Sequence, residues 1–454
     1  MISSTLRRAQ GRHLKMKDSL FGTDGIRERV GSHPLTQELL PKIGDAIALW
    51  LQKKYGSSPT ILIAQDTRES CAYIKSLLKS GLLRHSVTVH DAFVLPTPAV
   101  HKLVQSNQFS CGIIISASHN AYADNGIKIV DGITGKLTAQ DEHSIAAIVA
   151  QESSEFAYRT FGAENFYSSA AQDYQHLVTA FFQPNFLRDM RVVLDCANGA
   201  TSTSAPAIFE HLGAHVIPLN TTPNGRNINH QCGAVHPQQL QQTVQESKAD
   251  IGFAFDGDGD RLTVVTRDGR IYNGDDILAL LSGHPTYAAQ NTIVSTVMAN
   301  QGLEAYLEEH DKKLIRTPVG DKFVAQTLTE QNVLLGGEQS GHIILADYAH
   351  CSDGIFAALR VMEVMLFTAN RELKSFIPFP QVLLNMPVKQ KKSLTQEPCA
   401  SLIAATQAQL PGGRLLVRYS GTENLLRILV EDADAQKAHN LSAQLARQLE
   451  KELG

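Results

Sequence analysis

Short apolar runs alternate with stretches of helical character along most of the chain, and this repetition constrains the fold more than any other feature. The runs occupy residues 60–64, 86–89, 112–115, 191–195, 251–255, 292–294 and 333–335. Such alternation is typical of α/β units, in which buried strands are joined by helices. We therefore expect three similar mixed α/β domains.

The pattern changes after Pro378. Strand-like runs near residues 413–419 and 425–430 are followed by a helical stretch from about 435 to 453, which predicts a smaller C-terminal α+β domain. A chain of 454 residues with 43% hydrophobic residues can bury several cores of this size. The expected domains are residues 17–165, 166–266, 267–377 and 378–454.

Residues 1–16 are expected to form a basic, disordered tail. Basic residues recur as far as Lys17 without a single acidic one, but no apolar segment of a secretory signal follows. An amphipathic transit peptide and translation from Met16 are the other interpretations of this segment.

The overall composition excludes several classes of partner. A net charge of −4 argues against nucleic acid, because a binding face needs clustered Lys and Arg. The six cysteines show no Cys-x-x-Cys spacing, which is typical of reduced structural thiols in the cytoplasm. No run approaches the roughly 18 to 20 apolar residues of a membrane helix. We expect a cytoplasmic protein without a membrane partner.

Three aspartates at alternate positions, Asp256, Asp258 and Asp260, directly follow the apolar run 251–255. An EF-hand loop starts similarly, but its sixth position needs Gly and its twelfth a bidentate Glu. Those positions hold Arg261 and Arg267. A solvated acidic turn is the simpler alternative. The spacing favours a Mg²⁺ site whose remaining ligands are water or phosphate oxygens.

A turn that contains Ser116, Ser118 and His119 follows the apolar run 112–115 and would present a hydroxyl at the end of a strand. The local sequence does not distinguish Ser116 from Ser118 as the reactive residue, and an ordinary turn would use the same residue types. No Gly-x-Ser-x-Gly elbow marks a hydrolase. Lys128 lies close enough in sequence to reach a phosphate held there, although alone it would be read as a surface lysine.

Two further loops place polar groups beside glycines. Glu338, Ser340 and His342 follow one apolar run, and a carboxylate with a hydroxyl suits sugar hydroxyl groups. A plain glycine-rich loop with a solvated Glu is the alternative. Near the C-terminus, an arginine, two hydroxyls and a glycine predict an anion site suited to phosphate: Arg418, Ser420, Gly421 and Thr422.

These motifs resemble, in order and over nearly the whole chain, those of the α-D-phosphohexomutase superfamily. They are Phe21–Arg27, the Ser118 loop, the Asp256 loop, Thr317–Val324, the Glu338 loop and the Ser420 loop. Gly337–His342 and Val319–Lys322 are most similar to the branch that acts on glucosamine phosphates. The chain departs from the family at Ala121 and Asn424, where Pro is common, and at Lys322, where Arg is common.

The resemblance implies a role for each matching residue. Ser118 would carry the transferred phosphate and, with Asp256, Asp258 and Asp260, would bind one Mg²⁺ per chain. Four residues would surround the reacting phosphate: Arg27, His119, Lys128 and Arg261. Glu338 and Ser340 would hold the sugar hydroxyls. The second phosphate would lie against Arg418, Ser420, Gly421 and Thr422. His342 is a weaker candidate for proton transfer.

The implied fold is three similar mixed α/β domains plus a smaller C-terminal α+β domain around a central cleft. The implied reaction converts glucosamine 6-phosphate to glucosamine 1-phosphate through a phosphoserine and a sugar bisphosphate, which is also the expected activator. The product would supply UDP-N-acetylglucosamine synthesis, and the protein would be a monomer or homodimer.

Glucose or mannose phosphate is the alternative substrate within the superfamily. A metal-dependent phosphatase would use the same serine and metal without the Ser420 loop. A phosphosugar sensor would not need the Asp256 cluster together with Ser118.

Overall fold

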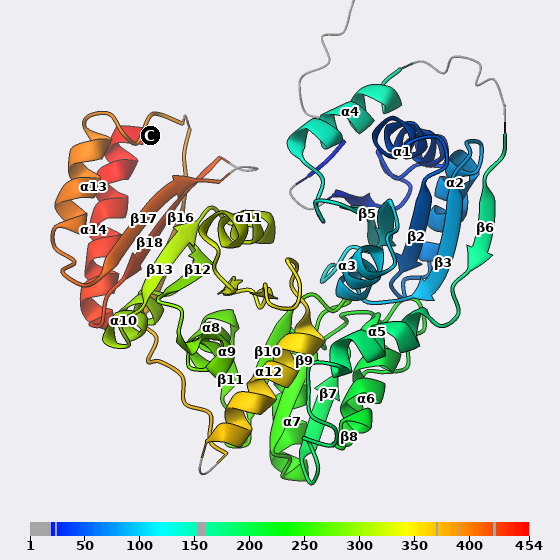
Figure 1. The fold of residues 1–454 in the computed structure, drawn as a ribbon. Helices are drawn as coiled ribbons and strands as arrows, with labels where there is room; N and C mark the ends of the chain where they lie inside the picture. The colour runs from blue at the N-terminus through cyan, green and yellow to red at the C-terminus, as the bar shows by residue number, and fades with distance from the viewer. Residues whose placement is uncertain are drawn as a thin grey trace, which may run out of the picture.

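The computed structural model describes residues 20–22, 25–151, 160–368, 371–389, 391–420 and 424–453. The expected basic tail, residues 1–16, lies outside the described residues. Four sheets follow one another along the chain, and their units form an open arc with the first unit at one end and the C-terminal unit at the other (Figure 1).

The first unit contains a sheet of six strands in the order β1-β5-β4-β2-β3-β6. Its elements are β1 (Ile26–Arg29), α1 (Leu39–Tyr55), β2 (Thr60–Gln65), α2 (Cys71–Leu82), β3 (Thr88–Val94), α3 (Thr97–Ser106), β4 (Cys111–Ile115), β5 (Asp124–Asp131), α4 (Ala139–Val149) and β6 (Ala163–Phe166).

The second unit contains a sheet of five strands in the order β11-β10-β9-β7-β8. Its elements are α5 (Ala170–Thr179), β7 (Arg191–Asp195), α6 (Thr201–His211), β8 (His215–Leu219), α7 (Gln238–Ser247), β9 (Ile251–Phe255), β10 (Leu262–Thr266) and β11 (Ile271–Tyr272).

The third unit contains a sheet of four strands in the order β13-β12-β14-β15. Its elements are α8 (Gly274–Ser282), α9 (Pro285–Ala288), β12 (Thr292–Thr296), α10 (Gln301–Glu309), β13 (Lys313–Thr317), α11 (Asp321–Gln331), β14 (Leu335–Gly337), β15 (Ile343–Leu345) and α12 (Gly354–Phe367).

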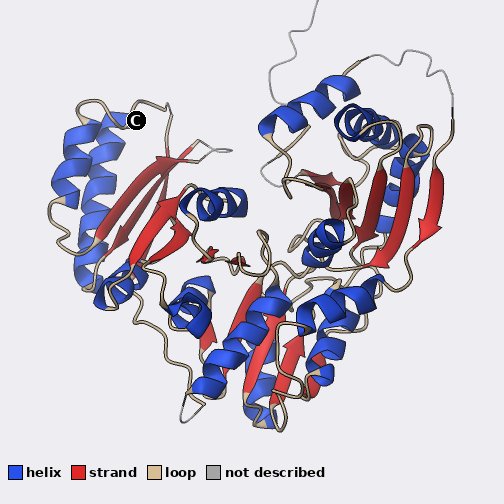
Figure 2. Ribbon diagram, in the orientation of Figure 1, coloured by secondary structure: helices blue, strands red, loops and turns tan. Residues whose placement is uncertain are grey.

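The C-terminal unit is an antiparallel sheet of three strands covered by two helices (Figure 2). Its elements are β16 (Gln381–Pro387), α13 (Cys399–Gln407), β17 (Arg414–Tyr419), β18 (Leu425–Glu431) and α14 (Ala435–Leu453). Leu441, Leu445 and Leu449 recur along one face of α14 and are buried, as expected for a helix that packs on a sheet. The predicted fold class is confirmed.

The first three sheets share one topology. Each has parallel strands at its centre and then one strand that runs back antiparallel beside the last of them: β5 on β4, β10 on β9 and β15 on β14. The connections between these strand pairs contain Ser118, the three aspartates and Glu338. The chain therefore places each candidate loop at the equivalent position of its sheet.

One predicted strand is displaced along the sequence. The apolar run 333–335 predicts a strand there, whereas β14 begins at Leu335. Val333 instead closes the preceding helix: Asn332 adopts a left-handed conformation and the Val333 N–H donates to the Leu328 carbonyl. An apolar residue just beyond a helix C-cap often packs back on the helix in this way.

One apolar cluster spans the first three units, which also contain smaller clusters of their own, whereas the C-terminal unit packs around a separate cluster. One buried cluster extends from Leu62 in β2 to Met365 in α12, whereas the C-terminal unit packs around its own cluster, which includes Ile428 and Leu445. Units that share a core move together, so the junction before the C-terminal unit is the natural place for domain motion.

The cysteines and helices agree with the sequence analysis. All six cysteines are among the described residues, each buried with a free thiol. Within the described parts of the chain, none of the helices combines the length and the apolar character needed to cross a membrane.

Candidate active site

The Ser118 loop directs one hydroxyl toward the aspartate cluster. Ser118 has a left-handed backbone conformation with φ of 49°, and its Oγ donates to Asp256 Oδ2 at 2.6 Å. Ser116 points elsewhere: its Oγ donates to Asp66 Oδ2 at 2.7 Å and accepts from the Ser118 N–H at 2.9 Å. The geometry therefore separates a hydroxyl that faces the acids from one that supports the turn.

The three aspartates form a compact buried group in the β9–β10 loop. Their ligand atoms lie within 4.8 Å of one another, and Asp256, Asp258 and Asp260 are all buried. Among the described residues, Asp258 Oδ1 and Asp260 Oδ1 have no hydrogen-bond partner. Buried carboxylate oxygens without partners are costly unless a cation neutralises them. The donor set fits a hard divalent ion such as Mg²⁺.

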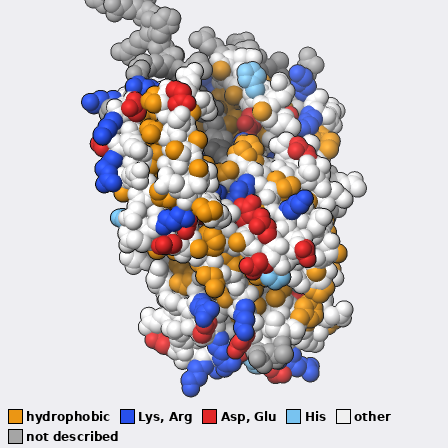
Figure 3. Space-filling model, turned by 90° about the vertical axis from the view of Figure 1, so that its left-hand side faces the viewer, with side chains coloured by type: hydrophobic (Ala, Val, Ile, Leu, Met, Phe, Trp, Pro, Cys, Tyr) orange, Lys and Arg blue, Asp and Glu red, His pale blue; other side chains and the backbone are white. Residues whose placement is uncertain are grey.

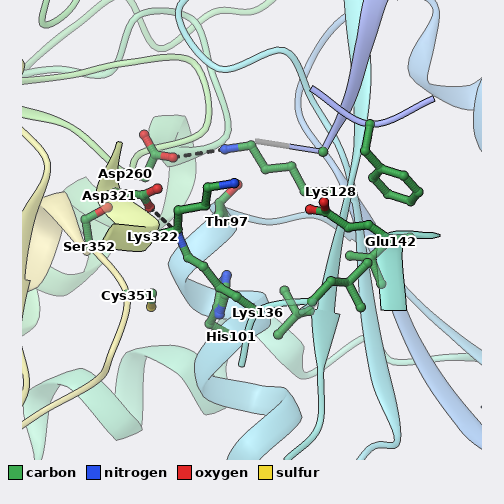
Figure 4. A pocket seen from close by; sticks show the side chains of 15 residues that line it. Thr97, His101, Lys128, Lys136, Glu142, Asp260, Asp321, Lys322, Cys351 and Ser352 are labelled. Carbon is green, nitrogen blue, oxygen red and sulfur yellow. Dashed lines mark hydrogen bonds and ion pairs between the residues drawn. The ribbon is translucent and has the colours of Figure 1, made fainter. Parts of the chain in front are cut away.

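The first unit contributes a cation and a hydroxyl to this group. The Lys128 ammonium on β5 lies 2.9 Å from Asp258 Oδ2 and 3.0 Å from Asp260 Oδ2. The Thr97 hydroxyl donates to Asp258 Oδ2 at 2.7 Å, and the Thr97 N–H donates to the Asp258 carbonyl. Figure 4 shows Lys128 extended from the first unit toward Asp260. Two units thus complete the site together.

The aspartates differ in pKa because their buried surroundings differ. Burial raises the pKa of the Asp256 carboxyl well above its ordinary value, and the neighbouring Asp260 and Asp258 raise it further. Burial also opposes ionisation of Asp258, but the Lys128 ammonium and the Thr97 hydroxyl hold the pKa of that carboxyl below its ordinary value. The raised pKa of Asp256 reflects the cost of gathering three carboxylates in the interior.

His119 is neutral at physiological pH. Burial lowers its pKa to about 4, and the charges of Arg261 and Arg27 act in the same direction. Its Nδ1 lies 3.3 Å from Ser118 Oγ. Arg27 belongs to β1, which pairs with β5, the strand of Lys128. The charge of Arg27 acts on both His119 and Asp258, so Arg27 lies near this group.

Arg261 joins the aspartate cluster to the Glu338 loop. Its Nε lies 3.9 Å from Asp256 Oδ2 and donates to His342 Nε2 at 3.1 Å. The other ring nitrogen of His342 lies 3.0 Å from Ser352 Oγ. Because the Nε2 lone pair accepts from Arg261, His342 could accept a substrate proton there only after this bond opens.

The Glu338 loop is a tight turn between β14 and β15. The Glu338 side chain is buried, and its Oε1 accepts from the Gly320 N–H at 3.0 Å. Ser340 is exposed. Gly341 has φ of 97°, and a Cβ there would meet the Leu262 carbonyl at 2.5 Å. Glycine therefore lets the loop pack closely on β10.

The fourth candidate loop is described only in part. Ser420 directly follows β17, is buried, and donates its N–H to the Leu425 carbonyl at 2.8 Å. Arg418 is half-buried in the same strand. Gly421 and Thr422 lie outside the described residues. Strands β17 and β18 end and begin on the side of the C-terminal unit that faces the first unit (Figure 1).

A pocket opens beside Lys128 and Asp260, between the first and third units. Thr97, His101, Lys136, Asp321 and Lys322 line it, with Lys136 paired to Asp321 across the two units (Figure 4). Seen from the side of the C-terminal unit, the surface is hollowed in the upper half of the view, and basic side chains gather along one upper edge (Figure 3). Three lysines and three acids share the lining of this pocket.

Several residues that shape the site do not stand out in the sequence. They are Asp66, Arg68, Thr97 and Asn229. Asp66 directly follows β2, which pairs with β4 in parallel. Carboxyl ends of parallel strands meet at one edge of a sheet, so the position of Asp66 after a strand could have indicated it. Nothing comparable marks Asn229.

Comparison with known families assigns the chain to one family over most of its length. Four descriptions of the phosphoglucomutase/phosphomannomutase family match: alpha/beta/alpha domain I at residues 18–156, domain II at 172–269, domain III at 273–381 and the C-terminal domain at 383–448. The chain belongs to this family of phosphohexomutases.

The curated relatives indicate which branch of the family the chain resembles. A phosphoglucosamine mutase of Lawsonia intracellularis is 39% identical over 95% of this chain and 98% of the relative. Another, of Wolinella succinogenes, is 40% identical over 92% of this chain and 95% of the relative. The predicted resemblance to the glucosamine phosphate branch is confirmed.

Solved structures share the fold. A phosphoglucomutase/phosphomannomutase family protein from Burkholderia thailandensis superposes with a TM-score of 0.77 at 23% identity, over 94% of this chain and 98% of that one. The N-acetylphosphoglucosamine mutase of Aspergillus fumigatus, solved with GlcNAc-6P and magnesium, has a TM-score of 0.65 at 16% identity, over 96% of each chain.

Proposed function

We propose that the protein is a phosphoglucosamine mutase, which interconverts glucosamine 6-phosphate and glucosamine 1-phosphate through a phosphoserine at Ser118. The observation that carries the proposal is the Ser118 hydroxyl, 2.6 Å from Asp256 inside the buried aspartate group. The identity of 38–40% with curated phosphoglucosamine mutases supports the choice of sugar.

Asp256, Asp258 and Asp260, with a phosphoryl oxygen on Ser118, would hold one Mg²⁺. When bound, the ion would neutralise charge on the phosphoryl oxygens and stabilise charge that develops during transfer. A phosphoserine has about −1.5 to −2 charges near neutral pH, and beside three carboxylates it needs such neutralisation.

The chain's own cations would complete the phosphoryl site. Arg27, Lys128 and Arg261 supply positive charge from three directions, and Arg261 can present two parallel N–H groups to a phosphate. Neutral His119 lies within reach of Ser118 Oγ and can share a proton with it. His342 stays the weaker candidate for proton transfer because Arg261 occupies its Nε2.

The site needs two phosphate-binding positions, because the bisphosphate intermediate must reverse its orientation before it returns a phosphoryl group to the serine. We expect Glu338 and Ser340 to bind the sugar hydroxyls. We expect the non-reacting phosphate to lie against Arg418, Ser420, Gly421 and Thr422. Water must be excluded while the intermediate reorients, which favours closure of the C-terminal unit over the site.

Glucose or mannose phosphate is the alternative substrate, since a 2-amino and a 2-hydroxyl group differ little in shape. We expect a cytoplasmic monomer or homodimer, activated by a sugar bisphosphate, whose product feeds UDP-N-acetylglucosamine synthesis.

The phosphoserine is tested by intact-mass measurement and turnover of Ser118→Ala beside Ser110→Ala. Ser110 also lies next to β4, but its hydroxyl accepts from the Thr60 N–H. Ser118→Ala should lose the mass of one phosphoryl group and roughly a thousandfold or more of turnover. Ser110→Ala should keep both. Full turnover in Ser118→Ala would refute the proposal.

A further inference from the structure

One buried guanidinium holds the backbone of the Ser118 loop. The Arg68 side chain is fully buried. Its Nη2 donates to the carbonyls of Ser118 and Asn120, both at 2.9 Å. Its Nη1 donates to the carbonyls of Ala121 and Asp124. Four carbonyls that lie on a single loop therefore converge on one planar cation.

Asp66 fixes the orientation of this cation. Its Oδ2 accepts from Arg68 Nε at 2.9 Å, and its Oδ1 accepts from the Arg68 N–H at 2.9 Å. The same carboxylate accepts from Ser116 Oγ, which in turn accepts from the Ser118 N–H. Both the carbonyl and the N–H of Ser118 are thus connected to Asp66 through one intervening side chain.

The second unit holds the loop from the opposite side of the domain boundary. The Asn229 amide donates to the Ser118 carbonyl at 2.8 Å and to the Asn120 carbonyl at 3.1 Å. The Ser118 carbonyl therefore accepts from both Arg68 and Asn229, which uses both of its lone pairs. A Cβ on Gly257 would lie 2.6 Å from this carbonyl, so the aspartate loop also touches it closely.

These bonds compensate an unfavourable conformation. A serine with φ of 49° occupies a region that residues with a side chain rarely adopt, and a conformation of this kind persists only where its surroundings impose it. If the four carbonyls were released, the loop could relax toward ordinary backbone angles, and the Ser118 hydroxyl would move away from Asp256.

We propose that Arg68 is a positioning residue for phosphoryl transfer: with Asp66 and Asn229 it holds the Ser118 hydroxyl in line with the aspartate cluster without touching the substrate. This inference rests on the proposed function, because it needs Ser118 to be the residue that carries the phosphate. The planar, forked shape of the Arg68 guanidinium matters more than its charge, because the ammonium of a lysine cannot reach four carbonyls at once.

The test compares Arg68→Lys with Arg360→Lys. Arg360 is likewise a buried arginine, but it bonds Asp347 and Glu363 on and near α12. Both variants keep a positive charge and lose a buried fork, so comparable losses of thermal stability are expected. Only Arg68→Lys should lower kcat, by roughly a hundredfold, since small misplacements of a reacting group cost about that much.

Three readouts separate positioning from general destabilisation. In Arg68→Lys, KM for glucosamine 6-phosphate should stay within about twofold of wild type while kcat falls. Incubation with glucose 1,6-bisphosphate should phosphorylate Ser118 more slowly, by intact mass. The ³¹P resonance of the phosphoserine should shift or broaden, because the loop is less fixed. Arg360→Lys should match wild type in all three.

If Arg68→Lys does not fold, Asn229→Gly serves as the test. Asn229 has φ of 56°, which glycine adopts without strain, so this change removes the side chain with its amide and does not strain the backbone. It should lower kcat about tenfold at unchanged KM. The inference is overturned if the folded variant keeps wild-type kcat and phosphorylation rate. Wild-type protein that gains no phosphate on Ser118 after incubation with glucose 1,6-bisphosphate would instead refute the proposed function.

Discussion

At the scale of single residues, neighbouring groups of the same type have different chemistry because their surroundings differ. Ser116 and Ser118 lie two positions apart, yet one supports a turn and the other faces the acids. Asp256 and Asp258 are both buried, but burial raises the pKa of Asp256 while Lys128 lowers that of Asp258. Residue type alone would not assign these roles.

Replacement of Asp258 by Asn tests the proposed ion site. The change removes one anionic ligand from a group of three, so Mg²⁺ affinity should fall and transfer should slow by roughly a hundredfold or more. Calorimetric titration with Mg²⁺ measures the affinity independently of turnover. Asp268→Asn is the control, since Asp268 is an exposed acid bonded to Thr266. Equal Mg²⁺ affinity in both variants would exclude the cluster as the ion site.

Asp275 predicts a pH dependence of stability. Its Oδ2 accepts from the Asn300 N–H and from Gln339 in the Glu338 loop, and burial raises its pKa to about 7 from an ordinary value of 3.8. The folded state thus favours the protonated acid. Asp275 therefore contributes stability that is complete below the unfolded pKa and is lost as pH rises through the folded one.

The variant Asp275→Asn cannot ionise. Relative to wild type, its midpoint of urea unfolding should rise between about pH 5 and about pH 8, because only wild type must bury a charge there. Parallel midpoints for the two proteins across this range would show that Asp275 does not titrate in it.

At the scale of elements, three equivalent strand connections produce one site from distant parts of the chain. The β4–β5 and β9–β10 connections meet so closely that the Gly257 position has no room for a side chain: a Cβ would lie 2.6 Å from the Ser118 carbonyl. Backbone cannot move aside as a flexible side chain can, so this contact sets the spacing between serine and aspartates.

Gly257→Ala should push the two loops apart. We expect turnover to fall by roughly tenfold to a hundredfold, because the displaced group reacts from the wrong position. Gly283→Ala is the matched control, since its nearest neighbour would lie 3.7 Å from the new Cβ. Wild-type turnover in Gly257→Ala would mean that the loops adjust freely.

The sequence predicted the elements better than the connections between them. Periodic apolar runs identify β4 and β9, because buried strands need such residues. Motif order predicts that the Ser118, Asp256 and Glu338 loops converge. Arg68 and Asn229 escape prediction because their bonds go to backbone carbonyls 50 or more positions away or across a unit boundary. Every residue has a backbone carbonyl, so residue identity does not reveal such partners.

At the scale of the whole molecule, the distribution of cores indicates which parts move. The first three units share apolar core, whereas the C-terminal unit has its own. Polar bonds cross their junction: the Asn300 side chain of the third unit donates to the Phe379 carbonyl and accepts from the Phe379 N–H, and Arg414 donates to the Val297 carbonyl. Polar junctions of this kind permit rotation more readily than large apolar interfaces.

Substrate should therefore close the arc. Addition of glucosamine 6-phosphate should lower the radius of gyration measured by small-angle X-ray scattering, because the proposed phosphate contact of the Ser420 loop would draw the C-terminal unit inward. Arg418→Ala should weaken this response without changing the ligand-free value. An unchanged radius of gyration in wild type at saturating substrate would contradict closure.

The most direct test of the account is a comparison of kcat/KM for glucosamine, glucose and mannose 6-phosphates in one mutase assay. The account predicts the highest value for glucosamine 6-phosphate, with Ser118→Ala inactive on all three sugars. A higher value for glucose or mannose 6-phosphate would contradict the proposed substrate and leave the phosphoserine chemistry in place, whereas turnover of any of them by Ser118→Ala would contradict the chemistry itself.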